Sequence, residues 1–498
     1  MTPGPHIPLV STRLAGCLPL ARALVVLREA IRSRAAGALP RGVIERIEIE
    51  IEPTAVLHWL AAQAPGQRWF FRSREGTLTT AGVGCALSFA TLADAAESGL
   101  LAKAAPAPHT PAPSLRWATA PTFYCASHFD PLARGKHAPE WAGFERSLVV
   151  LPIIEVRRTD ETILAVHVTT DVSQALSALE QCEPPVEQLH LPRGLRQTSD
   201  GDPVRWADGI DAALGAIASG SIEKVVLART RGYCAIESID PCGVLFGLIE
   251  EEPIAFHFLI EQSEGSAFLG ASPERLFRRT GDLIESEAVA GTCGRGPDGA
   301  SDDRLAGRLL NSDKNRREHE IVIRRIDSVL APMVERLVCD ESPRVMRLRH
   351  VQHLMTTTSG RLLDGVDDAR VVSELHPTPA VCGWPVESSR EFIRQHERMG
   401  RGLYAGVVGV TSADSSDFSV AIRSALICRS EMTAYSGAGI VRGSDSDAEW
   451  LETERKLSAF EALVARAVNS RSQQEDVART GSQHAAREMA LPRLVAGP

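Results

Sequence analysis

Runs of β-branched, aromatic and other apolar residues, separated by short Gly-containing turns, recur through the second half of the chain. They include "SIEKVVLART", "AFHFLIEQ", "SAFLGASPERLF" and "DLIESEAVAGT". Three more runs between residues 402 and 441 are expected to form one three-strand meander. Such runs are typical of strands in antiparallel or mixed sheets. Helix-forming segments interrupt them irregularly, so the sequence predicts an α+β (mixed α/β) fold with large sheets.

The first 200 residues carry fewer signals. "GVIERIEIEIE", "RSLVVLPIIEVRR" and "ILAVHVTTD" are predicted strands, the last two an antiparallel pair. Residues 102–114 form an Ala/Pro loop, and residues 470–498 form a polar tail that we expect to be disordered. The strand and helix patterns are densest between residues 204 and 466.

Composition excludes several functions. The net charge is -9 and no long basic block occurs, which argues against a nucleic-acid surface. The apolar run "LAGCLPLARALVVL" is too short for a membrane span, is interrupted by Arg22, and is expected to continue as an amphipathic helix through "REAIRSR". Ten scattered cysteines without a C-x-x-C pair indicate free thiols in a reducing compartment. We therefore expect a cytoplasmic protein.

A long helix is predicted from Ser312 to about Leu337, with Ser312 or Asp313 as its cap. Its apolar stripe runs through Val322, Ile326 and Val329, and one turn before Val322 stands Glu318. Taken alone, Glu318 fits an acid stabilised by the helix N-terminus and half in water.

A second helix repeats this arrangement in "SDSDAEWLETERKL". Glu449, Glu452 and Lys456 precede its predicted buried stripe of Phe460, Leu463 and Ala467. Unpaired carboxylates at about 4 Å repel by roughly 4 kcal/mol at an effective dielectric of about 20, so a cluster of them needs a cation. Glutamate and water ligands without His or Cys suit Mg²⁺. The alternative is an ordinary i,i+4 ion pair between Glu452 and Lys456.

Two residues are candidates for acid and base chemistry. Lys224 stands on the apolar face of its strand, where burial would lower its pKa and permit it to act as a base. The alternative is a strand-end lysine that reaches solvent. Glu274 follows a Gly and a Pro at a turn that could present a carboxylate, although exposed turn acids are common.

Other residues could bind an anion or approach a ligand closely. Arg423 and His353 interrupt apolar surroundings, and a buried arginine needs an anionic partner. Gly291, Gly437 and Gly439 expose backbone N–H groups, although each could also belong to an ordinary turn.

Ten segments, taken in order, resemble the chorismate-utilising enzymes, and most closely the isochorismate synthases. They are "KVVLAR", "GASPERLF", "AVAGT", "LLNSDKNRREHEIV", "VQHLMTT", "ELHPTPAVCGWP", "YAGVVG", "VAIRSALI", "YSGAGIV" and "AEWLETERKL". The resemblance covers residues 204–466. Residues 1–200, with "RWFFRSREG" and "LPIIEVRR", resemble the variable flank that completes the same fold in this family. The resemblance implies a single body with two packed sheets and surrounding helices.

The resemblance also implies roles. Lys224 would be the general base and Glu274 the general acid. Glu318 and Glu452, supported by Glu449, would bind Mg²⁺, which would hold the ring carboxylate of chorismate. The implied substrate-binding residues are Gly291, Thr292, His353, Ala380, Tyr404, Arg423, Gly437, Ala438, Gly439 and Lys456.

The implied reaction is the reversible conversion of chorismate to isochorismate, with water added at C2 and the C4 hydroxyl lost. The alternative is a salicylate synthase, which continues to pyruvate elimination. Those enzymes resemble F-P-S-x-T-A-S-G where this chain reads "HPTPAVCG", and Ala380 lacks the hydroxyl. The aminating relatives lack a lysine at the place of Lys224, so no amidotransferase partner is implied. A relative that binds without catalysis is disfavoured because Lys224 and Glu274 are both present.

The resemblance leaves the pathway open among menaquinone, siderophore and salicylate biosynthesis. Monomers are usual among such synthases, so we expect a monomer with a small-molecule substrate.

Overall fold

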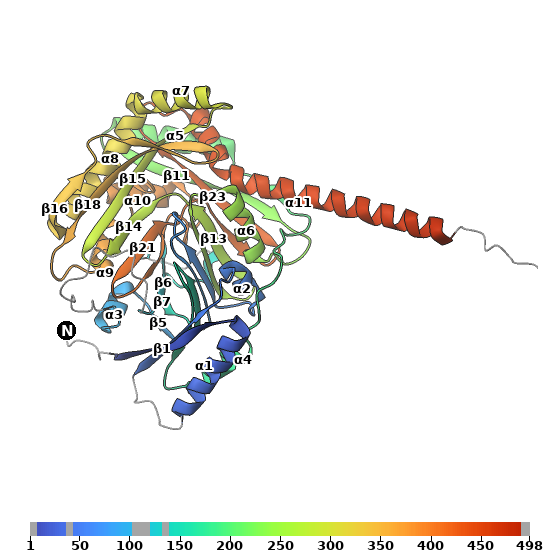
Figure 1. Cartoon of the computed structure of the whole chain (residues 1–498). Coiled ribbons are helices and arrows are strands. Elements are labelled where there is room, and N and C mark those ends of the chain that lie inside the picture. The colour runs from blue at the N-terminus through green and yellow to red at the C-terminus, as the bar shows by residue number, and fades with distance from the viewer. Residues whose placement is uncertain (1–6, 36–42, 102–119, 132–138, 490–498) are drawn as a thin grey trace, which may run out of the picture.

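The computed structural model describes residues 7–35, 43–101, 120–131 and 139–489. The predicted Ala/Pro loop at residues 102–114 lies outside them. The described strands form two sheets, packed together with helices around them (Figure 1). This confirms the expected fold class.

The larger sheet has 13 strands in the described residues. In spatial order they are β1 (Leu9–Leu18), β2 (Ile44–Ile51), β9 (Thr162–Val168), β8 (Ile154–Arg158), β4 (Thr79–Val83), β3 (Arg68–Arg72), β12 (Phe256–Ser263), β13 (Ser266–Ser272), β22 (Ser424–Cys428), β23 (Glu431–Ile440), β11 (Lys224–Cys234) and β10 (Arg196–Ser199), with β19 (Gly383–Trp384) beside β11. Strand β1 runs parallel to β2, and β8 and β9 form the predicted antiparallel pair.

The smaller sheet has ten strands in the same part of the chain. Their order is β16 (Val334–Cys339), β18 (Val351–Leu362), β15 (Leu283–Gly294), β14 (Arg275–Thr280), β21 (Ser415–Val420), β20 (Val407–Thr411), β6 (Phe123–Ser127), β7 (Ser147–Leu151) and β5 (Leu87–Phe89), with β17 (Arg344–Arg347) beside β18. Both sheets therefore take strands from the first 170 residues and from the segment after residue 204.

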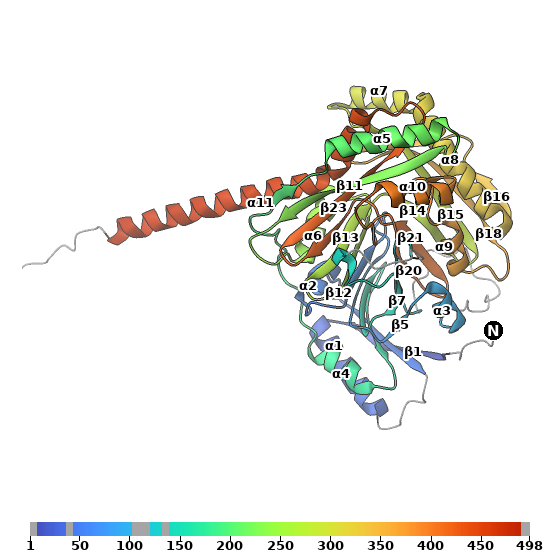
Figure 2. The ribbon, with the colours of Figure 1, turned by 180° about the vertical axis from the view of Figure 1, so that it is seen from behind.

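The helices cover the sheets and the ends of the body (Figures 1 and 2). They are α1 (Leu20–Ala35), α2 (Val56–Ala62), α3 (Leu92–Glu97), α4 (Val172–Glu180), α5 (Pro203–Ala218), α6 (Pro241–Glu251), α7 (Gly299–Leu310), α8 (Asp313–Leu330), α9 (Asp368–Leu375), α10 (Val386–His396) and α11 (Ser446–Met489), with short 3₁₀ turns η1 (Pro139–Trp141) and η2 (Ala331–Met333). In the described residues, no helix combines the length and hydropathy that a membrane crossing requires.

Alternation along the strands creates two hydrophobic clusters. On β12, Phe258 belongs to the cluster that joins the two sheets, whereas its neighbour Leu259 belongs to a second cluster beneath α1, α2, α4, α6 and α11. Phe460 and Leu463 of α11 lie in the second cluster, as the apolar stripe predicts. The larger sheet is thus buried on both faces.

Three predicted boundaries are wrong. The helix expected to reach Leu337 ends at Leu330, because Pro332 cannot continue it. The N-terminal apolar run divides at Pro19 into β1 and α1. The tail expected to be disordered from residue 470 is helical backbone to Met489 and projects from the body (Figure 1). Residues 446–489 contain no proline, the residue that most strongly ends a helix.

The expected three-strand meander is also wrong. Strands β20 and β21 belong to the smaller sheet, whereas β22 and β23 belong to the larger one. The chain passes between the sheets at residues 421–423, where Arg423 adopts a positive φ of 51°. This crossing lies at the site described next.

Candidate active site

Two chain crossings between the sheets lie side by side. The first passes from β13 to β14 through Pro273 and Glu274, and the second from β21 to β22 through residues 421–423. The carbonyl oxygen of Glu274 accepts hydrogen bonds from the Val420 amide (3.1 Å) and the Ser419 hydroxyl (2.8 Å). The Ser272 hydroxyl donates to Val420 O at 2.6 Å. These bonds hold Glu274 and Arg423 at one place between the sheets.

A cavity opens at these crossings and gathers most of the predicted site residues. Those that line it are Glu274, Gly291, Thr292, Glu318, His353, Ala380, Tyr404, Arg423, Gly437, Gly439 and Lys456. Residues that the sequence analysis did not single out complete the lining: Val226, Pro273, Val289, Ala290, Val381, Ile422, Tyr435 and Ser436. Lys224, Ala438, Glu449 and Glu452 are not among the lining residues.

Lys224 is fully buried, so it does not reach solvent as the alternative interpretation supposed. Its Nζ lies 3.0 Å from Oε1 of Glu318 on α8. The pair packs against Gly439 of β23, where a Cβ atom would stand 2.3 Å from that oxygen and 2.9 Å from Cε of Lys224. Only glycine leaves room there, because real Cβ contacts do not come so close.

Glu274 is 3% exposed, and burial raises its pKa to about 7, although the positive charges of Lys224 and Lys456 act in the opposite direction. Its Oε1 accepts a long hydrogen bond from the Thr378 hydroxyl at 3.4 Å. A carboxyl group with a pKa near neutrality is partly protonated at physiological pH, so Glu274 can donate a proton.

A polar chain runs along one wall of the cavity. Nη2 of Arg423 lies 3.0 Å from Nε2 of His353, and Nδ1 of that ring lies 3.1 Å from the Thr292 hydroxyl. Guanidinium is only a donor, so Nε2 must accept and Nδ1 must carry the proton. Burial, followed by the charge of Arg423, holds the pKa of His353 well below its usual range. His353 is thus neutral and Arg423 keeps its charge beside the cavity.

Each of the three predicted metal ligands contacts a lysine. Glu318 pairs with Lys224, Glu449 with Lys314, and Glu452 with Lys456 at 2.7 Å, the i,i+4 pair that the sequence analysis weighed. In the described residues, no three His, Cys, Asp or Glu side chains converge closely enough to hold a metal ion.

Two of these carboxylates, Glu449 and Glu452, nevertheless interact electrostatically. Burial and the neighbouring charge of Glu452 raise the pKa of Glu449. Burial also tends to raise the pKa of Glu318, but Lys224, Lys456 and Lys314 outweigh it and hold this pKa below its usual value. All three acids act electrostatically on Lys314, so the beginnings of α8 and α11 bring them within range of this one lysine, and their role as joint metal ligands stays a prediction.

The remaining predicted residues differ in how they face the cavity. Lys456 Nζ donates to the carbonyl oxygen of Gly437 at 3.0 Å. The ring of Tyr404 stacks on Tyr435 with centroids 5.1 Å apart. Ala438 does not line the cavity: its methyl group lies in the hydrophobic core, because it alternates with Gly437 and Gly439 along β23. The role expected of its backbone amide stays a prediction.

Three residues at the site were not predicted from the sequence: Lys314, Asn315 and Thr378. Asn315 Oδ1 accepts from the Thr292 amide at 3.3 Å, and a Cβ on Gly291 would meet Asn315 at 3.1 Å. Helical spacing could have identified Lys314, which stands four residues before Glu318 on the same face. Thr378 carries no comparable signal, because it approaches Glu274 only in the folded chain.

The sequence model of the family described as "Chorismate binding enzyme" matches residues 32–465. The chain belongs to this family. Within it, an "Isochorismate synthase, chloroplastic" of Catharanthus roseus is 35% identical over 359 residues, which cover 68% of this chain and 62% of that protein. A "Salicylate biosynthesis isochorismate synthase" of Pseudomonas aeruginosa is 36% identical over 363 residues, covering 70% of this chain and 75% of that protein.

A solved structure agrees with these similarities. The structure of MenF, the menaquinone-specific isochorismate synthase from Escherichia coli, has a TM-score of 0.77 at 28% identity and covers 89% of this chain and 99% of that chain. The alignment with the Catharanthus roseus relative, in contrast, spans less than two thirds of that protein's length.

Proposed function

We propose that the protein is an Mg²⁺-dependent isochorismate synthase that interconverts chorismate and isochorismate. The observation that carries this proposal is a buried acid that lines the cavity within electrostatic reach of a buried amine: the carboxyl group of Glu274, with a pKa of about 7, experiences the charge of the fully buried Lys224. The isochorismate synthases among the relatives support the same reaction.

The reaction needs both groups. Water adds to C2 of the ring, both conjugated ring double bonds shift by one position, and the C4 hydroxyl leaves, so one water is consumed and one is released. Hydroxide leaves poorly, and Glu274 would supply its proton. Lys224 would take a proton from the attacking water, which requires the neutral amine. The carboxylate of Glu318 lies 3.0 Å from Lys224 Nζ, so Glu318 would hold the amine in place for that step.

Substrate carboxylates would meet the positive charges of the cavity. Arg423 and Lys456 line it, and both are already held by neighbouring groups, Arg423 by His353 and Lys456 by Gly437 O. A site held in advance loses less conformational freedom when an anion binds. The peptide N–H groups around Gly437 and Gly439 are further candidate donors.

Glu318, Glu449 and Glu452 would hold the metal. Their carboxylate oxygens suit a hard cation, and Glu449 is 1% exposed beside a second acid, an arrangement that a cation stabilises. When bound, Mg²⁺ would offset the charge of the ring carboxylate and help to orient the ring. The lysines that now pair with these acids would have to share or release them.

The proposed function is tested by incubating the protein with chorismate and Mg²⁺ and separating the products. A mixture of chorismate and isochorismate supports the proposal. Salicylate and pyruvate as main products would instead make the enzyme a salicylate synthase, and no change in chorismate would overturn the assignment.

We also infer that the enzyme works in the cytoplasm as a monomer without an amidotransferase subunit. The presence of Lys224 supports the absence of an amidotransferase subunit, because the family resemblance links a lysine at this place to water rather than ammonia as the nucleophile. Size-exclusion chromatography with light scattering tests the monomer. Formation of an aminated product with ammonium salts would contradict the choice of nucleophile.

A further inference from the structure

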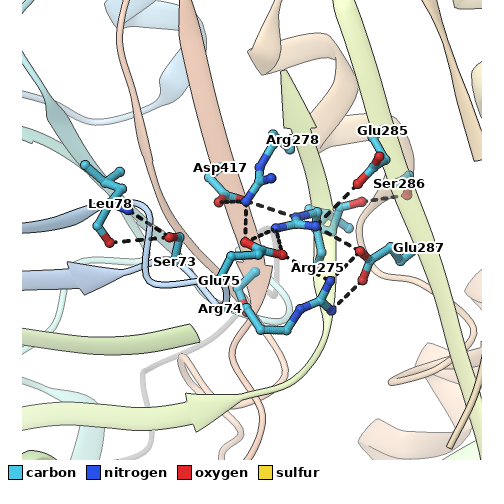
Figure 3. Close-up of polar contacts among 12 residues, drawn as sticks. Ser73, Arg74, Glu75, Leu78, Arg275, Arg278, Glu285, Ser286, Glu287 and Asp417 are labelled. Atoms are coloured by element: carbon cyan, nitrogen blue, oxygen red, sulfur yellow. Dashed lines mark hydrogen bonds and ion pairs between the residues drawn. The ribbon is translucent and has the colours of Figure 1, made fainter. Parts of the chain in front are cut away.

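A loop of the N-terminal flank reaches the crossing that carries Glu274. This loop joins β3 to β4 and includes Arg74 and Glu75 from the segment "RWFFRSREG". Nη1 of Arg74 donates to the carbonyl oxygen of Pro273 at 2.9 Å. Arg74 also forms a two-point pair with Glu287, with both N–O distances 2.6 Å, and Figure 3 shows the two side chains facing each other.

A second arginine approaches Glu287 from the other side. Arg275, the residue after Glu274, donates to Glu287 Oε1 at 2.9 Å, to Asp417 Oδ1 at 3.2 Å and to both carboxylate oxygens of Glu75 at 2.8 Å (Figure 3). The guanidinium groups of Arg74 and Arg275 both lie over the ring of Phe256, 5.5 and 5.1 Å from its centroid. Arg275 and Glu287 have only 2% of their side chains exposed and Arg74 has 10%, whereas Glu75 has 37%, so the part of the network around Glu287 is largely dry and its Glu75 edge meets solvent.

We propose that Arg74 is a positioning residue for Glu274, fixing the backbone before it and holding the Glu287 carboxylate near it. This inference rests on the proposed function, in which Glu274 is the general acid.

The backbone geometry supports the proposal directly. The peptide group between Pro273 and Glu274 is held on both sides: its N–H, which belongs to Glu274, donates to the Ser272 hydroxyl at 3.2 Å, and its carbonyl oxygen, which belongs to Pro273, accepts from Arg74. Arg74 holds that oxygen, while Ser419 and Val420 hold the carbonyl of Glu274 itself. Both peptide oxygens that flank the Cα atom of Glu274 are thus fixed. As a result, the direction in which its side chain leaves the backbone is also fixed. A misplacement of about 1 Å can cost roughly 100-fold in rate.

The charges around Glu274 independently support a positioning role for Arg74. The charged groups that act on Glu274 are Lys224 of β11, Lys456 of α11 and Glu287 of β15, and Thr378 faces it as a neutral partner. The negative charge of Glu287 disfavours the ionised form of Glu274. Arg74 and Arg275 partly neutralise that charge. Loss of Arg74 should therefore raise the pKa of Glu274, whereas loss of the Glu287 charge should lower it.

The test compares Arg74→Met, Arg74→Lys and Glu287→Gln. Arg278→Met is the matched control, because Arg278 contacts Glu75 and Asp417 in the same network, and none of its described contacts reaches Pro273 or Glu287. For each variant, kcat, KM for chorismate and the pH dependence of kcat/KM are measured, with folding checked by circular dichroism and thermal unfolding.

We expect Arg74→Met to lower kcat about 10- to 100-fold with little change in KM. We expect Arg74→Lys to recover part of that loss, since lysine keeps the charge without the two-point geometry. The limb of the pH profile that reports Glu274 should move to higher pH in Arg74→Met and to lower pH in Glu287→Gln. Arg278→Met should retain kcat and the wild-type profile.

The outcomes separate this inference from the proposed function. If the wild-type protein does not convert chorismate, the proposed function is wrong, and this inference is then wrong as well. If wild type is active and folded Arg74→Met has unchanged kcat, or if the two pH shifts have the same sign, the positioning role is wrong while the function stands. A double variant with effects that simply add would also contradict a joint action of Arg74 and Glu287.

Discussion

The ammonium nitrogen of Lys224 lies 3.0 Å from a carboxylate oxygen of Glu318, which joins the first residue of β11 to the first turns of α8. Lys224 is fully buried and the Glu318 side chain is 13% exposed. The candidate base and a candidate metal ligand are therefore one electrostatic unit, and removal of either changes the other.

Lys224→Met should abolish turnover, with a loss of at least about 100-fold, because the general base is gone. It should also destabilise the protein by a few kcal/mol, since Glu318 is left without its buried partner. Product assays and urea unfolding measure the two effects. The double variant Lys224→Met/Glu318→Gln should regain stability but not activity, and recovery of turnover in it would refute the role of Lys224.

Glu274→Gln should be inactive yet more stable than wild type above pH 7. The pKa of Glu274 is raised from 4.5 to about 7, so folding favours its protonated form. The stabilisation from protonation is complete below the unfolded pKa and is lost as pH rises through 7. Above pH 7 the variant should gain on the order of 3 kcal/mol over wild type, by the usual 1.36 kcal/mol per pKa unit.

Urea unfolding at several pH values measures this difference. The gap between Glu274→Gln and wild type should be smallest near pH 4.5 and largest above pH 7. An equal gap across this range would show that ionisation of Glu274 does not oppose folding.

Gly439→Ala should reduce turnover strongly, because its methyl group would stand 2.3 Å from Glu318 Oε1 and displace the pair with Lys224. Gly215→Ala is the matched control: nothing lies within 4 Å of a Cβ atom there, and the residue is in the last turn of α5. This control should keep full activity and gain about 0.5 to 1 kcal/mol from helix propensity. Wild-type activity in Gly439→Ala would indicate that the pair tolerates displacement.

Chelator treatment should abolish turnover, and Mg²⁺ should restore it. Independently of activity, Mg²⁺ should raise the melting temperature of the substrate-free protein, because a ligand that binds the folded state stabilises it. Glu318→Gln and Glu449→Gln should weaken that shift. Glu320→Gln, on an exposed part of the same helix α8, should not. A shift that is unchanged in all three variants would place the metal elsewhere.

Local pattern predicted the strands that carry the site and the two helices that carry the acids. It could not assign strands to sheets, because alternation defines the faces of a strand but not its neighbour. The crossing at Arg423 is the clearest case: "DFSVAIRSALICRS" has the composition of one strand region, yet it spans both sheets. Periodicity does not encode a change of sheet.

Ion-pair partners were predictable only where they lie on one helix. The pair of Glu452 and Lys456 follows from i,i+4 spacing. The partners Lys224 and Glu318 belong to different elements, and Lys314 reaches Glu449 on another helix, so the folded chain alone brings them together. The placement of Glu274 near Lys224 was implied by family resemblance rather than by any local signal.

Each sheet combines strands from distant parts of the chain, and this has a consequence for biosynthesis. Strand β6 pairs with β20, and Ser127 faces Val407 in that ladder, so β6 must wait for a partner about 280 residues later in the chain. At roughly 5 to 20 residues per second, translation of that interval takes on the order of 15 to 60 seconds. During this time the open edge of β6 is available for wrong pairings. We therefore expect a nascent chain of this topology to need chaperones until its last strands have left the ribosome.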